Sequence, residues 1–309
     1  MERAPLGLAS TCYMTVRRLS DALALLRHAD TLGACGAQAA LAAGQAREVR
    51  EYCEPRRLYF ESMAALPRED GDARFAAALR DAREAGARCV RVVCLSGRRY
   101  EAFRTLDEWR AFAGESRRRL AFAARIAARE RMPLAVENHK DWTLDELTAL
   151  LREFGSEWLG VCLDTGNNLA LLDDAGEFVD ALAPHAASTH LKDMALAADS
   201  EGFLLAEVPL GTGMLDIPRI VRRIREARPG TPLTLEMITR DPLRVPCLNS
   251  SYWATFPERA APRLAAMLAL AHSNQGALPR LSDLPVSARL ECEEENVKAC
   301  LRWAREHLA

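Results

Sequence analysis

The amino-acid sequence predicts a single (β/α)8 barrel, an α/β fold in which eight parallel strands alternate with helices. Short strand-like runs alternate with longer helical patterns along most of the chain, which is the order of a parallel sheet with crossover helices. We count eight such runs, the number that closes a barrel. The length of 309 residues suits a barrel that forms one domain.

Eight segments have the length and composition of buried strands. The second lies in the alanine-rich sequence 33–46, which satisfies a helix as readily as a strand. In chain order the segments are LGLAS at 6–10, ACGAQ at 34–38, LYFESM at 58–63, CVRVVCL at 89–95, PLAVEN at 133–138, LGVCLD at 159–164, STHLKD at 188–193 and PLTLEM at 232–237.

The segments between these strands carry apolar residues at spacings of three and four, as amphipathic helices do. Two helix starts have the S/T-x-x-E capping box, formed by Thr105 with Glu108 and by Thr143 with Glu146. The clearest helical patterns cover residues 72–86, 105–130 and 216–229.

The sequence changes character after the last strand. Residues 237–258 are irregular and contain prolines, so we expect a long loop at the mouth of the barrel that could act as a lid. Residues 275–285 form a turn-rich linker before a last helix at 287–308. We therefore expect a barrel over 1–275, and over 276–309 a helical extension that packs on the barrel or on another subunit of a homo-oligomer.

Composition excludes several classes of partner. Lys and Arg total 41 against 43 for Asp and Glu, and the net charge of -2 offers no basic field for a nucleic acid. No apolar stretch is long enough to span a membrane, and the N-terminal sequence lacks the apolar core of a secretion signal. We therefore expect a cytoplasmic protein that binds neither nucleic acid nor membrane.

The cysteines indicate reduced thiols rather than disulfides or a zinc site. There are nine, an odd number, and none forms a CxxC pair. Cys89, Cys94 and Cys162 lie in strand-like runs, so we expect them in the core.

Four polar residues close the last four predicted strands: Glu137, Asp164, His190 and Glu236. Their separations are 27, 26 and 46 residues, and the longest gap contains an extra segment at 194–213. A barrel of about 250 residues gives roughly 31 residues to each βα unit, so the four fall on adjacent strands. Since strand ends converge at one mouth, we expect these side chains to meet there.

Three carboxylates and one imidazole form a hard, oxygen-rich site for one divalent metal ion. Such a site suits Mn²⁺, Mg²⁺ or Co²⁺, and Zn²⁺ is also compatible. A single strand-end acid often caps a helix or pairs with a lysine instead. That alternative does not account for four ligands in register.

Five motifs at the strand ends are VENH at 136–139, LDTGN at 163–167, THLKD at 189–193, PLGTGMLD at 209–216 and LEM at 235–237. Together they resemble the xylose isomerase-like barrels of the sugar isomerase and epimerase superfamily, over roughly residues 5–275. The resemblance implies that Glu137, Asp164, His190 and Glu236 bind the metal.

The GTGMLD sequence invites comparison with a dinucleotide-binding loop. It follows a loop and precedes DIPRI, whereas a dinucleotide fingerprint follows a strand. We therefore interpret it as a glycine turn that leads to a helix capped by Asp216.

A metal that chelates a ketone oxygen and a neighbouring oxygen stabilises an enediolate, which isomerases, epimerases, dehydratases and decarboxylases can all use. Ketose 3-epimerases of the family usually have His where Asn167 stands and Arg shortly after the metal His. In this chain the residues that follow His190 are LKDMALA, which contain no such Arg. The DNA-repair endonucleases of the superfamily need additional histidines, and this chain has only six.

Three cations, Lys140, Lys192 and Arg240, lie just beyond strand ends. Any one of them could be an ordinary solvated charge in a loop. Together with Asn167, however, the three could bind a carboxylate of the substrate, and they would suit a phosphate equally well. The loop RDPLRVPCLNSSYW at 240–253 and the chain length also resemble the 3-oxo-isoapionate decarboxylases. We therefore favour a lyase that releases CO₂ from a 3-oxo sugar acid.

His139 and Lys140 are candidates to protonate the enediolate or orient the substrate, although His139 could instead be a packed residue behind the metal site. The alternative activity is a sugar isomerase, either a ketose 3-epimerase or an aldose–ketose isomerase, with Glu137 and Glu236 as proton shuttles. A sugar-acid dehydratase and a metal-free sugar-binding protein remain further alternatives. Asp193 could hold Lys192 or form a surface pair.

Overall fold

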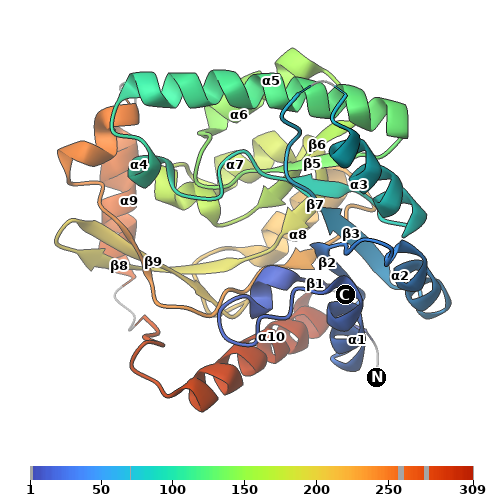
Figure 1. Cartoon of the computed structure of the whole chain (residues 1–309). Coiled ribbons are helices and arrows are strands. Elements are labelled where there is room, and N and C mark those ends of the chain that lie inside the picture. The colour runs from blue at the N-terminus through green and yellow to red at the C-terminus, as the bar shows by residue number, and fades with distance from the viewer. Residues whose placement is uncertain (1–2, 70, 257–260, 275–277, 309) are drawn as a thin grey trace.

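The computed structural model describes residues 3–69, 71–256, 261–274 and 278–308. Eight parallel strands form one sheet in the order β10-β1-β2-β3-β4-β5-β6-β7. Leu191, just after β7, pairs with Leu235 of β10, and its N–H donates to the Thr234 carbonyl at 2.8 Å. This contact brings the two edges of the sheet together, so the predicted barrel is confirmed (Figure 1).

All eight predicted strands are present, including the second, which the alanine-rich sequence left open. They are β1 (Gly7–Ala9), β2 (Gly36–Ala40), β3 (Tyr59–Met63), β4 (Val90–Val92), β5 (Leu134–Glu137), β6 (Leu159–Asp164), β7 (Ala186–His190) and β10 (Thr234–Leu235).

Helices surround the barrel, and their apolar faces pack against the strands in one continuous core. Both predicted capping boxes form, at Thr105 and at Thr143. Asp216 caps α8 by accepting the Arg219 N–H at 3.0 Å. The helices around the strands are α1 (Ala22–Thr31), α2 (Ala46–Cys53), α3 (Ala73–Glu84), α4 (Arg99–Ala102), α5 (Leu106–Glu130), α6 (Leu144–Phe154), α7 (Ala175–Leu182) and α8 (Ile217–Ala227).

A second, three-stranded sheet lies outside the barrel, where the sequence predicted only an inserted segment and a loop. Strands β8 (Asp193–Asp199) and β9 (Gly202–Val208) form an antiparallel hairpin, and β11 (Leu243–Val245) pairs with β9. Within the long loop expected over 237–258, residues 243–245 form β11 and Ser250–Thr255 form a short 3-10 helix, and residues 257 and 258 lie outside the described part of the chain. Figure 1 shows the hairpin reaching toward α9 (Ala261–Ser273).

The hairpin forms because its apolar residues alternate and pack under the 237–256 segment. Leu196, Phe203 and Leu205 are fully buried, and they pack with Tyr252 in a core cluster separate from that of the barrel. Gly202, at the turn, has φ of +150°, and a Cβ there would lie 2.3 Å from the Val245 carbonyl. A glycine is therefore required where β9 meets β11.

The C-terminal helix α10 (Val286–His307) packs on the barrel, as expected for a helical extension. Its residues Val297, Cys300 and Leu301 are buried in the main core. The Arg305 side chain donates to the Leu32 carbonyl just after α1 at 2.8 Å. The expected boundary between residues 275 and 276 lies outside the described residues.

All nine cysteines are free. Cys89 and Cys162 are buried as predicted, whereas Cys94 is only partly buried. Among the described residues, none of the helices combines the length and the apolar character needed to cross a membrane.

Candidate metal centre

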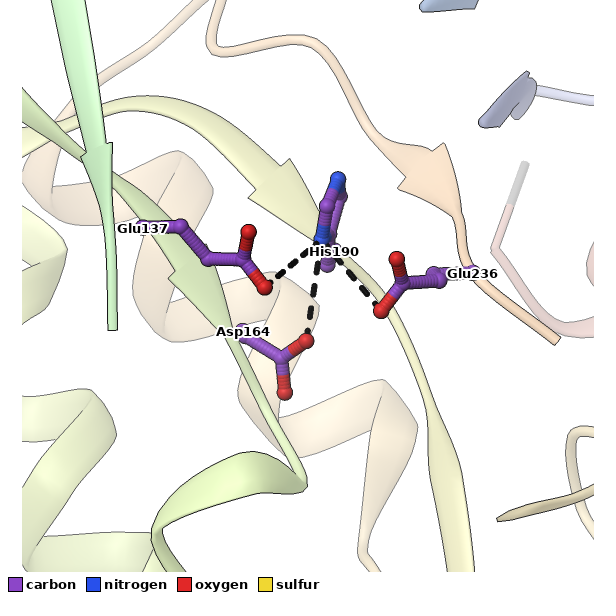
Figure 2. A group of neighbouring side chains, drawn as sticks. All are labelled: Glu137, Asp164, His190 and Glu236. Carbon is purple, nitrogen blue, oxygen red and sulfur yellow. Dashed lines mark ion pairs between the residues drawn. The ribbon is translucent and has the colours of Figure 1, made fainter. Parts of the chain in front are cut away.

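The structure brings the four strand-end residues together. Glu137 ends β5, Asp164 ends β6, His190 ends β7, and Glu236 directly follows β10. One ligand atom from each lies within 4.8 Å of all the others. His190 Nδ1 is 3.5 Å from Glu137 Oε1, 3.6 Å from Asp164 Oδ2 and 3.4 Å from Glu236 Oε2, as Figure 2 shows. We refer to these four residues as the quartet.

The buried atoms of the quartet fit a metal ion. His190 Nδ1 faces three carboxylates, but a single nitrogen can donate only one hydrogen bond. Neither His190 Nδ1 nor Asp164 Oδ2 has a hydrogen-bond partner in the described part of the chain, although the Lys192 Nζ lies 3.0 Å from Asp164 Oδ2 as an ion pair. Buried polar atoms without partners are costly, and a divalent cation would satisfy them together. The quartet could therefore bind a metal ion.

Positive groups lie beside both glutamates of the quartet. The Arg91 guanidinium, from β4, donates two hydrogen bonds to Glu137 Oε2, the one from Nε at 2.6 Å. Lys192 Nζ lies 2.6 Å from Glu236 Oε2. Burial alone would raise the pKa of Glu137, but the charges of Arg91 and His190 hold it far below its usual range. Burial also raises the pKa of Glu236. The positive charges of His190 and Lys192 outweigh this effect and hold that pKa well below its usual value.

A cavity of about 340 Å³ is lined by Glu137 and Glu236 of the quartet. All the predicted catalytic and cationic residues line it, whereas Asn167 lies behind it, against Lys140. A larger cavity, of about 580 Å³, contains no quartet residue. The charged or titratable residues that line the smaller cavity are Arg91, Arg98, Glu101, Glu137, His139, Lys140, Lys192, Glu236 and Arg240.

Comparison with known proteins places the chain in a family. Residues 22–269 match the model of the xylose isomerase-like TIM barrel. The chain belongs to this family. The resemblance that the strand-end motifs predicted is therefore confirmed, and the fold is that of sugar-processing enzymes.

One curated relative of this xylose isomerase-like barrel is a 3-oxo-isoapionate decarboxylase of Pectobacterium atrosepticum. The two are 32% identical over 94 residues, which is 30% of this chain and 34% of that protein. The match thus spans about a third of the relative's length.

Solved structures share the fold at low sequence identity. A xylose isomerase-like protein of Mycobacterium smegmatis in complex with magnesium has a TM-score of 0.56 at 16% identity, covering 88% of this chain and 100% of that one. An L-ribulose 3-epimerase has a TM-score of 0.56 at 18% identity, covering 96% and 97%.

Lys140 is the most unusual cation of this xylose isomerase-like site. Its side chain is buried and donates a hydrogen bond to Asn167 Oδ1. It forms no ion pair with any residue that the structure describes. Burial and the nearby charge of Lys192 lower the pKa of Lys140 from 10.5 to about 8. A lysine in this state can give up its proton near neutral pH.

His139 lies beside Lys140 at the cavity wall. It is partly buried, and its Nδ1 is 3.1 Å from the Gly97 carbonyl, to which it can donate. Burial and the charge of Lys140 lower the pKa of His139 to about 4. The ring is therefore neutral at pH 7, and the Gly97 contact leaves Nε2 free to accept a hydrogen bond.

The other two predicted substrate-binding cations have partners within the protein. Lys192 contacts Asp164 and Glu236, and Arg240 pairs with Glu207 at 2.5 Å. Glu207, at the end of β9, is itself buried and lies 3.8 Å from Lys192 Nζ. Sequence analysis missed Glu207 because the hairpin that carries it was not predicted.

Arg91 was missed for a different reason. It lies in the predicted strand CVRVVCL, and a charged residue in such an apolar run was a signal that a buried partner exists. Strand position alone did not identify that partner as Glu137.

Asp193 does not hold Lys192, so that expectation is wrong. Its carboxylate is buried and accepts N–H groups from Gly211 and Gly213 at 2.9 Å each, and from Leu215 at 3.1 Å. A Cβ at Gly213 would lie 2.2 Å from Asp193 Oδ1. The glycines of GTGMLD thus let the backbone wrap around Asp193.

Proposed function

We propose that this xylose isomerase-like barrel binds one divalent metal ion through the quartet and releases CO₂ from a 3-oxo sugar acid. The observation that carries the proposal is that both glutamates of the quartet lie against fixed cations. Such carboxylates stay ionised and accept protons poorly. Decarboxylation needs no base, whereas isomerisation does.

The alternative is a sugar isomerase or epimerase, the activity named for the L-ribulose 3-epimerase neighbour. Moving a proton across a sugar carbon requires a base whose pKa lies near the working pH. Arg91 occupies Glu137 Oε2, and Lys192 lies at Glu236 Oε2. These contacts favour decarboxylation over proton shuttling by the two glutamates.

In the proposed reaction, the bond between the carboxyl carbon and C2 breaks and CO₂ leaves. The electron pair of that bond forms a C2–C3 double bond, and the C3 carbonyl oxygen takes the negative charge. A bound divalent cation, Mn²⁺, Mg²⁺ or Co²⁺ by the donor set and Zn²⁺ as a compatible choice, supplies positive charge for that oxygen. To give the product, the C3 carbonyl forms again and the electron pair of the C2–C3 double bond takes up one proton at C2.

Lys140 is the proposed proton donor. The residue lines the cavity, its side chain forms no ion pair among the described residues, and its pKa is about 8, so it is mostly protonated at pH 7. The proton passes from Nζ to C2 as the carbonyl forms again. His139, which is neutral, orients the substrate by accepting a hydrogen bond from a hydroxyl group.

The charge of the cavity supports an acidic substrate. Five cations line it, Arg91, Arg98, Lys140, Lys192 and Arg240, against the carboxylates of Glu101, Glu137 and Glu236. An excess of positive charge favours an anion. The family of sugar-processing enzymes implies a small sugar, and the partial match to a 3-oxo-isoapionate decarboxylase is consistent with a sugar acid.

The test offers the purified chain with Mn²⁺ to 3-oxo sugar acids, to their phosphorylated forms and to neutral ketoses, all in D₂O. We expect CO₂ release from an acid, one deuterium on the product carbon that was C2 of the substrate, and loss of activity with EDTA. Deuterium uptake into a ketose without CO₂ would show the isomerase instead.

A matched pair of variants tests the quartet in the same assay. Asp164→Asn keeps the oxygen that accepts from Gly166 and Asn167 but replaces Oδ2, so it should abolish metal binding and CO₂ release together. Asp174→Asn, which alters an exposed helix cap with an equally good capping residue, should change neither. Metal content by elemental analysis gives the readout.

A further inference from the structure

A polar layer lies inside the barrel, next to the quartet, and the proposed reaction does not use it. Gln38, Glu61, Ser188 and Thr234 are all fully buried. Ser188 precedes His190 by two positions in β7, and Thr234 precedes Glu236 by two positions. Because strand side chains alternate, these residues share the inward face with the quartet, one level deeper. Gln38 and Glu61 pair across β2 and β3.

The hydrogen bonds of Gln38 fix the orientation of its amide. Its Nε2 donates to Glu61 Oε2 at 2.9 Å and to Ser188 Oγ at 3.2 Å, which uses both amide hydrogens. Its Oε1 lies 2.7 Å from His190 Nε2. An amide oxygen can only accept, so His190 must carry a proton on Nε2.

Glu61 prevents the amide from turning over. Its Oε2 accepts from Gln38, from the Ser188 hydroxyl at 2.9 Å and from the Thr234 hydroxyl at 3.0 Å. Since Ser188 donates its hydrogen to Glu61, its oxygen can only accept from Gln38. A reversed Gln38 would set its carbonyl oxygen against the Glu61 carboxylate, which has no hydrogen to offer.

We propose that Glu61 and Gln38 form a relay that keeps a proton on His190 Nε2, so that Nδ1, which faces the three carboxylates, is the nitrogen that gives up its proton to bind the metal. Both are positioning residues, because neither touches the substrate cavity. The relay sets the tautomer and the ring orientation that a metal ligand needs. This inference rests on the proposed metal site but not on the substrate or the reaction.

The test is the affinity of the full chain, freed of metal with EDTA, for MnCl₂ measured by calorimetry. Gln38→Met has similar length but no acceptor for His190 Nε2. Changes in the groups that orient metal ligands typically weaken affinity about 10–100-fold, and we expect that loss here. Thr234→Val is the matched control, because it removes one donor from Glu61 and leaves all three hydrogen bonds of the Gln38 side chain in place. Its dissociation constant should stay close to that of the wild type.

A spectroscopic readout examines the histidine directly. In the Mg²⁺-loaded wild type, nitrogen-15 spectra should show a proton on His190 Nε2 that exchanges slowly with water. In Gln38→Met this proton should exchange fast. If Gln38→Met does not fold, Glu61→Gln carries the same affinity test, with a smaller weakening expected because an amide cannot accept all three donors as a carboxylate does.

The outcomes separate the relay from the metal site. Unchanged Mn²⁺ affinity in the folded Gln38→Met variant, or a His190 proton on Nδ1, would overturn the relay and leave the metal site standing. A wild-type chain that binds neither ion would overturn the metal site and the relay with it. Weakened binding in Gln38→Met with normal binding in Thr234→Val supports both.

Discussion

Each carboxylate of the quartet lies beside a fixed positive group. Arg91 holds Glu137, while Lys192 lies against both Asp164 and Glu236. Lys140 differs from these cations, because the one hydrogen bond that its side chain forms with a described residue runs to the uncharged Asn167. Two kinds of cation therefore occupy one site, one that fixes charge and one that can give up a proton.

Lys140→Met should slow the protonation step. Removal of a general acid typically lowers the rate about 10²–10⁴-fold, and we expect kcat for the protonated product to fall within that range. In the wild type, kcat should decrease as pH rises through about 8, because Lys140 loses its proton there. The pH profile of kcat measures both effects. A profile that is flat from pH 7 to 10 would contradict the role of Lys140.

The same substitution should stabilise the fold. The pKa of Lys140 is about 8 in the folded chain and 10.5 when solvated. Below pH 8 the side chain is charged in both states, so the folded state bears the whole free-energy cost of burying that charge. As pH rises from 8 to 10.5, the unfolded state binds more protons and the penalty disappears. Lys140→Met should therefore raise the free energy of unfolding at pH 7 by on the order of 1–3 kcal/mol.

Denaturant unfolding at pH 7 and at pH 10.5 measures this difference. We expect the gain at the lower pH and little gain at the higher one. A variant that is less stable than the wild type at pH 7 would show that the Lys140 contact with Asn167 outweighs the cost of its buried charge.

The residues of the quartet could be predicted because each ends a strand, and strand ends meet at one mouth. The ion pair of Arg240 could not be predicted, because its partner Glu207 lies in a sheet outside the barrel. Gln38 and Glu61 carried no motif. Their role depends on which side chains face each other across the barrel interior. Those facing pairs are set by the register between neighbouring strands, which the sequence does not show.

At the scale of elements, the β8–β9 hairpin acts on the cavity indirectly, through the contact of Glu207 with the cavity-lining Arg240. Glu207 is the next-to-last residue of β9, and its partner Arg240 precedes β11. The sequence hid this sheet because its strands follow β7 after only two residues and lack a turn motif such as Asn-Gly. Their alternating apolar residues were the available signal.

Gly202→Ala should disrupt the junction of β9 and β11. The added Cβ would meet the Val245 carbonyl at 2.3 Å, in a backbone conformation that other residues rarely adopt. We expect a loss of about 1–3 kcal/mol in unfolding free energy, measured by denaturant titration. Gly114→Ala is the control: it lies within α5 with open space around it, and should stabilise by about 0.5–1 kcal/mol. Equal effects of the two substitutions would contradict this account.

At the scale of the whole molecule, α10 belongs energetically to the barrel even though it follows the last strand. Leu301 is 1% exposed and lies in the main core. The (β/α)8 architecture was predictable because alternation of strands and helices repeats along the chain. The sequence alone left open whether α10 covers this barrel or another subunit, because an apolar helix face does not specify its partner.

Leu301→Ala should destabilise the entire fold. Loss of a buried leucine side chain costs about 2–5 kcal/mol when the surroundings cannot collapse into the space. Unfolding followed by circular dichroism and by tryptophan fluorescence should shift together, in one transition. Leu248→Ala, at a side chain that is 53% exposed, should change little. Separate transitions would indicate that residues 276–309 unfold as an independent unit.

The cations beside the quartet also bear on how a reaction cycle ends. Three carboxylates with Arg91 and Lys192 leave one negative charge, which a divalent ion would turn into one positive charge. A sugar acid balances that charge when it arrives. When CO₂ leaves, the negative charge stays on the C3 oxygen, and it is neutralised when Lys140 gives its proton to C2. We expect the neutral ketone left behind to be held more weakly than the acid, so that turnover itself empties the site for the next molecule.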